Sequence, residues 1–398
     1  MYIKSDFSKF ALYSGFSAMS PFYMLFLLYA NHLLGSYAIA GLLLSLKFLL
    51  GVILQILFSG IKDRAELKYT LSAAEAVSSL GYVFLAIAPL FSGYIMTFLC
   101  IGIFFRSMAG ALWYGTYNSF IYEDFEENNS EVGSKPYSKI QSIFCIGISL
   151  GAVIAATLAG VYSYSAAMLF GAFANGTASI IALSLKGPEK CPKGEDCLTK
   201  PEISILHFSR AVKKMFKNEK LRYISFAEII RMSLVEVFNS FAIPFYKTFM
   251  PVTSIGYVEA LKAMMASLSF GFSEIVIKKM HFLRAIKTFY IIRALLVILA
   301  IVFNSIVSPM MIVFRTLFFG PMMTSVEYIM QQNYTKEERV TMSSSLSILS
   351  QVFGMIFIVL LGFVADLCSI QCALMVLIPF YAIPYLLYKK QFRILGKE

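Results

Sequence analysis

Charged residues are scarce in this chain of 398 residues: Asp, Glu, Lys and Arg together make up 14%. A soluble domain carries roughly 25% of these residues. So few charges cannot cover a water-facing surface, whereas 58% of the residues are hydrophobic and the mean hydropathy is +0.73. The composition therefore excludes an ordinary soluble globular protein and indicates a membrane protein.

Residues and motifs that carry catalysis are also scarce. The three histidines, His32, His207 and His281, fall in loops or at expected membrane edges. The sequence contains no Gly-x-x-x-x-Gly-Lys-Ser/Thr phosphate loop, no His-Glu-x-x-His metal motif and no Gly-x-Ser-x-Gly nucleophile motif. We therefore expect a protein that is not an enzyme, has no catalytic residues, metal site or cofactor, and is not driven directly by ATP.

The hydrophobic residues come in twelve long blocks. Each block is close to the ~20 residues that a helix needs to cross a bilayer core of ~30 Å. The blocks are longer than the ~10 residues of a membrane β-strand and do not alternate in polarity. The predicted fold class is therefore an all-α membrane protein with twelve transmembrane helices. The expected spans are 7–30, 37–60, 69–90, 94–121, 140–161, 164–185, 223–248, 255–279, 286–307, 309–331, 342–364 and 370–388.

The net charge of +11 reflects orientation in the membrane and not a nucleic-acid partner. Of the 34 Lys and Arg residues, 27 fall at the N-terminus, in alternate loops and at the C-terminus. The positive-inside rule places these segments in the cytoplasm. The expected outer loops are short and lack an Asn-x-Ser/Thr sequon. We therefore expect a multi-pass monomer in the plasma membrane, with the lipid bilayer as a partner and both termini cytoplasmic.

The spans divide six and six around a polar stretch. The predicted domains are a six-helix bundle over residues 1–185, a cytoplasmic linker over 186–221 and a second six-helix bundle over 222–398. Apolar and basic residues interleave over 203–218, which predicts an amphipathic helix on the inner leaflet. Cys191 and Cys197 in the linker could pair or bind a metal, but at a cytoplasmic location we expect free thiols.

Weak internal repetition supports two matched halves. A shift of 220 residues aligns Tyr37 with Tyr257, and a shift of 209 aligns Arg106 with Arg315. Similar offsets in the same order indicate two parallel six-helix repeats, which one large transporter architecture uses.

Two motifs resemble those of the major facilitator superfamily. The stretch 59–68 reads Ser-Gly-Ile-Lys-Asp-Arg-Ala-Glu-Leu-Lys and is similar to the family's Gly-x-x-x-Asp-Arg-x-Gly-Arg-Arg loop. Asp63, Arg64 and Lys68 match this pattern, whereas Glu66 replaces a Gly and Leu67 a basic residue. The resemblance implies that Asp63, Arg64 and Lys68 form a cytoplasmic gate that latches the two halves together.

The fourth span carries the second motif. Phe105-Arg106-Ser107-Met108-Ala109-Gly110 resembles the family's Arg-x-x-x-Gly pattern, and residues 115–123 are similar to a further conserved stretch of many members. The resemblance covers essentially the whole chain. It implies that the first, fourth, seventh and tenth spans line a central cavity.

Eleven ionisable residues lie within the expected spans. Each isolated charge near the bilayer centre costs roughly 2.5–3.5 kcal/mol, so eleven unpaired charges would cost about 30 kcal/mol. That exceeds a typical net stability of ~5–15 kcal/mol, and the charges therefore need partners or water. A water-filled cavity between two helix bundles offers both. The residues are Lys47, Glu75, Arg106, Glu228, Arg231, Glu236, Glu259, Lys262, Arg293, Arg315 and Glu327.

Some of these charges have a structural interpretation. Glu228 and Arg231, three positions apart, are expected to neutralise each other. Lys47 and Arg293 lie on helices expected to flank the cavity, which favours structural pairing. Arg106 could either brace the fold through carbonyl groups or Glu75, or face the cavity.

The fourth span also predicts a binding surface. Arg106, Gly110, Trp113 and Tyr117 follow the spacing of one helical stripe. We expect Arg106 to bind a polar or anionic group of the substrate, and Trp113 and Tyr117 to contact its apolar part.

The seventh and tenth spans supply the remaining candidates. Asn239 and Arg315 are expected to bind substrate, with Asn239 near a predicted kink at Pro244. Glu236 and Glu327 are the candidates for the carboxylate that carries a coupling proton.

The sequence thus predicts a secondary active transporter that moves a small polar or anionic solute by alternating access, with a proton as the coupling ion. One alternative is a proton-antiport exporter of amphiphilic compounds, since such exporters share the Asp-Arg loop and the fourth-span Arg. An alternative of another class is a non-transporting membrane receptor or scaffold, which would bind a solute without moving it.

Overall fold

The computed structural model describes residues 2–62, 66–117, 120–121, 135–186, 201–334 and 339–394. Within these ranges every regular element is a helix, which confirms the all-α prediction. The first half of the chain contains α1 (Tyr2–Ala18), α2 (Phe22–Leu34), α3 (Tyr37–Lys62), α4 (Leu67–Ile87), η1 (Ala88–Leu90), η2 (Ser92–Tyr94), α5 (Ile95–Trp113), α7 (Lys135–Val161) and α8 (Tyr164–Leu183).

A connecting helix, α9 (Pro201–Lys217), leads to the second half. That half contains α10 (Glu219–Lys247), α11 (Val252–Gly271), α12 (Ser273–Met280), α13 (Phe282–Phe303), α14 (Ser308–Thr316), α15 (Phe319–Gln332), α16 (Arg339–Leu367), α17 (Ile370–Met375), η4 (Ile378–Tyr381) and α18 (Ala382–Ile394). Cys191 and Cys197 lie outside the described residues, as do Asp63 and Arg64.

The helices are long and apolar enough for a multi-pass membrane protein. Among the described residues, nine helices qualify as membrane spans, or up to eleven if each of two bent pairs is one span. The bent pairs are α11 with α12, at 53°, and α14 with α15, at 43°. Together with α10, which is 29 residues long and carries ionisable residues, these helices are consistent with twelve spans.

Two expected spans break where the sequence disfavours a helix. The first span divides into α1 and α2 just before Pro21, which lacks the backbone N–H of a helix interior. The fourth span was predicted to continue to residue 121, but α5 ends at Trp113. Tyr114 is extended and Gly115 has φ of 85°, a left-handed conformation that favours glycine. By contrast, α10 continues through Pro244 to Lys247.

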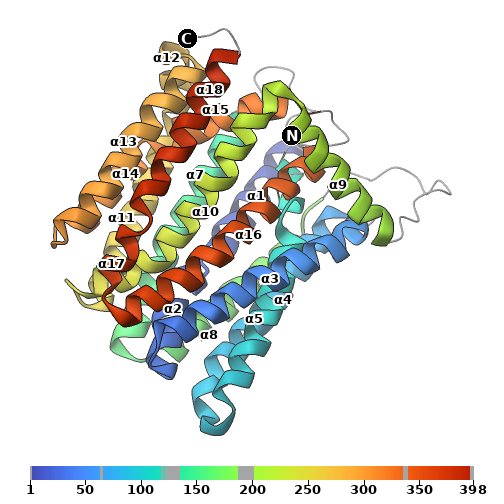
Figure 1. Ribbon diagram of the computed structural model, residues 1–398. Coiled ribbons are helices and arrows are strands. Elements are labelled where there is room, and N and C mark those ends of the chain that lie inside the picture. Colours follow the sequence, from blue (N-terminus) through green and yellow to red (C-terminus); the bar gives the residue numbers. More distant parts are fainter. Residues whose placement is uncertain are drawn as a thin grey trace.

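Two helix pairs join the halves of the molecule. The first pair is α7 with α11, and the second is α3 with α16, which lie beside each other in Figure 1. Small residues allow close approach, because a Cβ on Gly256 would overlap the Cβ of Ala156 and lie 2.9 Å from the Ala152 carbonyl oxygen. A Cβ on Gly362 of α16 would lie 2.9 Å from the carbonyl oxygen of Tyr37. The helices of each pair therefore touch backbone to backbone.

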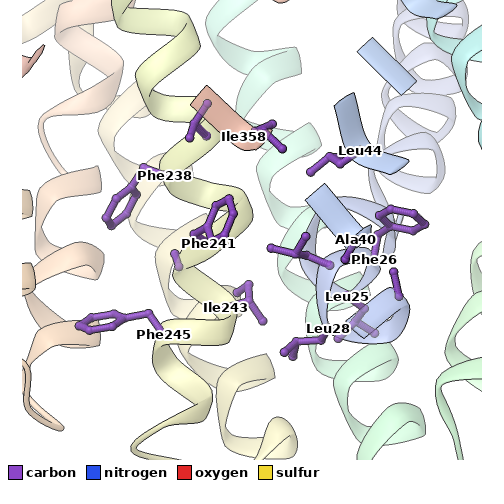
Figure 2. Packing of buried hydrophobic residues seen from close by; sticks show 14 of the residues in the cluster. Leu25, Phe26, Leu28, Ala40, Leu44, Phe238, Phe241, Ile243, Phe245 and Ile358 are labelled. Atoms are coloured by element: carbon purple, nitrogen blue, oxygen red, sulfur yellow. The ribbon is translucent and has the colours of Figure 1, made fainter. Parts of the chain in front are cut away.

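The two ends of the molecule differ in how the halves meet. We call the end that carries the start of α1 and the end of α18 the terminal end, and the other the opposite end (Figure 1). At the opposite end, one continuous hydrophobic core spans both halves. Figure 2 shows Phe241 and Ile243 of α10 on the side that faces Leu25 and Leu28 of α2. The halves are therefore closed against each other at this end.

At the terminal end, each half has a hydrophobic core of its own. The core of the first half includes Phe10 and Phe120, and that of the second includes Ile286 and Tyr388. A smaller cluster around Phe270 connects α7, α11 and α15. The apolar contact between the halves is thus less extensive at this end than at the opposite end.

The predicted amphipathic linker helix is present as α9. Its Lys213, Lys214 and Lys217 are exposed, whereas Met215 is fully buried in the core of the second half. The helix packs against α3, α16 and α10 and so contacts both halves. We expected the apolar face of this helix to contact lipid. At Met215, this face instead packs against the second half of the protein.

Candidate functional site

A cavity of about 510 Å³ lies between the two halves. Its walls come from α1 to α5, α7 and α8 of the first half and from α10, α11 and α16 of the second. Three cations and three carboxylates are among the lining residues. They are Lys47, Glu75, Arg106, Glu236, Glu259 and Lys262. Six of the eleven charges expected within the spans therefore line one cavity between the halves.

Arg106 is held by neutral polar groups from α4, from α8 and from the connection between α1 and α2. Its guanidinium donates to Ser78 Oγ, to Asn175 Oδ1 at 3.3 Å and to Ser20 Oγ at 3.2 Å. The Tyr82 ring lies beneath it, with its centroid 4.5 Å from Cζ. Within the described residues no carboxylate forms an ion pair with Arg106. Its charge is therefore positioned by hydrogen bonds and remains available to an anionic group.

Glu75 of α4 faces the cavity beside this network. Ser17 donates to its Oε1 at 2.5 Å and Tyr13 donates to the same oxygen at 3.2 Å. Both donors belong to α1, so Glu75 connects α4 to α1. The structure shows no hydrogen bond or ion pair between Arg106 and Glu75 among the described residues, so Arg106 does not brace the fold through that carboxylate.

Lys47 of α3 and Glu236 of α10 face the cavity from different halves. The Lys47 ammonium donates to Tyr23 Oη at 3.3 Å and lies 4.4 Å from the centroid of that ring. It also acts electrostatically on Glu236. Neither residue forms an ion pair within 4.0 Å among the described residues. A cation and a carboxylate from different halves thus line the same cavity.

The remaining two charges of the cavity neutralise each other. Glu259 and Lys262 lie three positions apart on α11 and form an ion pair. Because both partners lie on one helix, this ion pair does not connect the two halves. The pair lines the cavity wall and keeps the α11 side neutral.

Three of the predicted site residues besides Glu236 line the cavity. Arg106, Trp113 and Asn239 are all among its lining residues. The Trp113 ring stacks on the Tyr117 ring with centroids 4.5 Å apart. The structure therefore brings together Arg106, Trp113, Glu236 and Asn239 from the two halves. Of the four spans that the resemblance implied for the cavity wall, the tenth (α14 and α15) contributes no lining residue among the described residues.

Three predicted residues do not line this cavity. Tyr117 is buried behind Trp113, with its hydroxyl 2.7 Å from Ser14 Oγ, because the helix breaks before Gly115 and turns it away. Arg315 is buried in the second half beside a separate small void. Glu327 lies half-buried on α15, outside both cavities.

The predicted gate lies largely outside the described residues, since these include neither Asp63 nor Arg64. Lys68 is described, and its ammonium lies 3.1 Å from the carboxylate of Glu66. That contact is local to the start of α4 and does not join the two halves.

Several cavity residues were not predicted as part of the site. Lys47 was assigned to structural pairing because α3 was expected to flank the cavity, yet Lys47 lines the cavity. Glu259 and Lys262 were recognised only as intramembrane charges. Their spacing of three positions could have predicted the ion pair, but nothing in the sequence shows which face of a helix points inward.

The fold and the cavity define a class: a multi-pass α-helical membrane protein with a polar cavity between two helical halves. The sequence matches the family model of the Major Facilitator Superfamily over residues 131–359, more than half of the chain. The chain therefore belongs to the major facilitator superfamily. No curated protein sequence matches it at a significant level.

Solved structures of transporters share this fold. The nucleoside transporter NupG superposes with a TM-score of 0.67 at 12% identity, with 99% of this chain and 100% of that chain covered. The E. coli fucose:proton symporter FucP gives 0.64 at 12% identity, with 97% and 98% covered. The POT family transporter PepTSo gives 0.70 at 14% identity, with 98% of each chain covered. The chain thus has the fold of a major facilitator transporter.

Proposed function

We propose that this protein is a secondary active transporter that moves a small polar or anionic solute across the membrane by alternating access, coupled to protons. The observation that carries the proposal is the cavity between the halves, in which Arg106, Lys47 and Glu236 face shared space without ion-pair partners among the described residues. A volume of about 510 Å³ suits a small molecule, since such sites typically measure ~300–1,000 Å³.

The walls supply complementary groups for such a solute. Arg106 and Lys47 would bind an anionic or electron-rich group, and Asn239 would hydrogen-bond from the other half. Trp113 provides an apolar surface about two turns from Arg106 on the same helix. A solute held by Arg106 on one side and Asn239 on the other would contact both halves, which alternating access requires.

Glu236 is the proposed proton carrier. When ionised, its carboxylate attracts Lys47 across the boundary between the halves, and protonation would remove that attraction. A proton would thereby change the relative stability of the two conformations, which is the requirement for coupling. Glu327, the other predicted candidate, lies outside the cavity and is not assigned this role.

The closed opposite end sets the direction in which the cavity faces. The shared hydrophobic core covers the cavity at the opposite end, so we propose that the cavity opens toward the terminal end. The positive-inside rule would place the terminal end in the cytoplasm, so the conformation would face inward.

Transport by reconstituted protein tests this function. Proteoliposomes with an imposed proton gradient would be screened with labelled sugars, nucleosides, amino acids and small carboxylates. We expect gradient-driven accumulation of at least one solute. Glu236→Gln should reduce this accumulation at least tenfold while solute exchange without a gradient continues, because Gln cannot release a proton.

Glu327→Gln is the matched control, since it makes the same chemical change outside the cavity. It should leave gradient-driven accumulation near the wild-type level. Equal loss in both variants, or full accumulation by Glu236→Gln, would reject the assigned carrier. Specific binding without any solute flux would instead support a receptor on the same fold.

A further inference from the structure

A second, much smaller void lies wholly within the second half of the molecule. Its volume is about 20 Å³, and it shares no lining residue with the large cavity. It lies among α10, α13, α14 and η4. Three of its lining residues are arginines: Arg231, Arg293 and Arg315. These side chains are more than nine-tenths buried, with exposed fractions of 5%, 7% and 4%.

One of the three arginines is neutralised by a carboxylate. Arg231 Nε lies 3.0 Å from both carboxylate oxygens of Glu228, and one Nη lies 2.5 Å from Oε2. Glu228 also accepts a hydrogen bond from the Tyr388 hydroxyl. With these bonds formed, Glu228 has little capacity left for the other two arginines. Glu259, which lines the large cavity, forms its ion pair with Lys262.

Arg293 and Arg315 have no ion-pair partner among the described residues. Their Nε atoms are buried and lack a hydrogen-bond acceptor. Arg293 donates to the thioether of Met322 at 3.5 Å, and thioether sulfur is a weak acceptor. Aromatic rings lie nearby, with Phe319 centred 4.7 Å from Arg293 Cζ. Ring faces offset only part of the cost of burying a guanidinium ion.

The cluster therefore has two positive charges in excess around one void. Arg231 and Arg315 both act electrostatically on Arg293, so the three cations repel one another. A water molecule could satisfy a free N–H group but carries no net charge to balance the two excess cations. An anion could do both, since it accepts hydrogen bonds and carries the opposite charge.

The size of the void limits the anion to a small one. A single water molecule needs roughly 10–15 Å³ on this measure, so about 20 Å³ accommodates one particle little larger than water. A sulfate, a phosphate or an organic carboxylate is too large. We propose that the void among Arg231, Arg293 and Arg315 is a structural binding site for a monatomic halide, chloride under ordinary conditions. The site is distinct from the transport cavity and does not depend on the proposed function.

The stability of purified protein in chloride tests the proposal directly. The melting temperature would be measured in detergent as sodium chloride replaces sodium gluconate at constant ionic strength. We expect a saturable rise with chloride and also with bromide, and no rise with sulfate. An identical melting temperature in chloride and gluconate would overturn the proposal.

Variants locate the effect within the molecule. Arg293→Gln and Arg315→Gln should each abolish the dependence on chloride, and should melt at or above the wild-type temperature in gluconate because a repelling charge is removed. Arg284→Gln is the matched control, since Arg284 is exposed on the same helix as Arg293. It should keep the chloride response. A response that persists in both cluster variants would contradict the site.

Bromide in crystals of the wild-type protein gives a readout that does not depend on how variants fold. We expect an anomalous scattering peak between Arg293 and Arg315. A well-ordered void without such a peak would overturn the assignment. Loss of the chloride response on addition of a transported solute would instead assign the arginines to the transport pathway.

Discussion

Glu228 and Arg231 of α10 form the best satisfied buried ion pair of the second half, and the sequence predicted it from their spacing. Adjacent turns of one helix bring residues three apart together regardless of tertiary structure, which made this contact predictable. The position of Lys47 was not predictable in this way, because it depends on how α3 is rotated against α10. Individual pairs within a helix were thus accessible to sequence reasoning, whereas contacts between helices were not.

Removing the carboxylate of this pair should destabilise the protein strongly. Glu228→Gln leaves Arg231 buried without a counterion, beside two further arginines, and breaking a buried pair costs about 3–5 kcal/mol. We expect a correspondingly lower free energy of unfolding, measured by denaturation in detergent. Glu274→Gln is the comparison, because Glu274 pairs with Lys278 at 2.8 Å at a partly exposed site. That change should cost less than about 1 kcal/mol, and equal losses would contradict the assignment.

At the scale of elements, Asp366 at the end of α16 caps the start of α3. Its carboxylate accepts from Ser36 Oγ at 2.7 Å and from the amides of Tyr37 and Ala38 at 2.9 Å each. This cap crosses from one half to the other at the opposite end. It supplies hydrogen bonds to amide groups that have no partner within their own helix.

Loss of the cap should loosen the first turn of α3. Asp366→Ala removes an interaction typically worth ~1 kcal/mol, so amide exchange at Tyr37 and Ala38 should accelerate about fivefold. Hydrogen–deuterium exchange with mass spectrometry provides the measurement. Ser369→Ala is the matched control, since Ser369 caps α17 within one half by accepting from the Cys372 amide at 3.1 Å. It should accelerate exchange in α17 and leave α3 unchanged.

Long apolar blocks predicted nearly all of these elements, since the length of a span and the composition of its residues follow from the bilayer itself. The breaks were harder to predict. Pro21 signalled the division between α1 and α2, whereas the end of α5 at Trp113 depends on the left-handed conformation of Gly115. A glycine within an apolar block does not reveal whether the chain will use that conformation. The error displaced Tyr117 from the predicted binding stripe.

For the whole molecule, the asymmetry of the hydrophobic cores predicts which side of the membrane reaches the cavity. In a background in which all six cysteines are replaced, Asn239→Cys places a thiol in the cavity wall. We expect an impermeant thiol reagent to label it from the side of the terminal end and not from the other side. The shared core of α2 and α10 blocks the second route.

Tyr162→Cys serves as the control for sidedness, because Tyr162 is 76% exposed between α7 and α8 at the opposite end. It should be labelled from that side alone. Equal labelling of Asn239→Cys from both sides would contradict the proposed conformation, and labelling from neither side would indicate an occluded state.

Because α11 meets α7 at Gly256, and α16 meets α3 at Gly362, the main chains of the two halves bear directly on one another along two lines. Helices in such close contact can rotate about the line of contact. A translation of one helix along the other would instead bring a side chain against a backbone carbonyl group. For the proposed alternating access, we expect these glycine contacts to favour rotation of the halves over sliding. A larger side chain at either position would meet backbone atoms of the other half, so we expect it to force the helices of that pair apart.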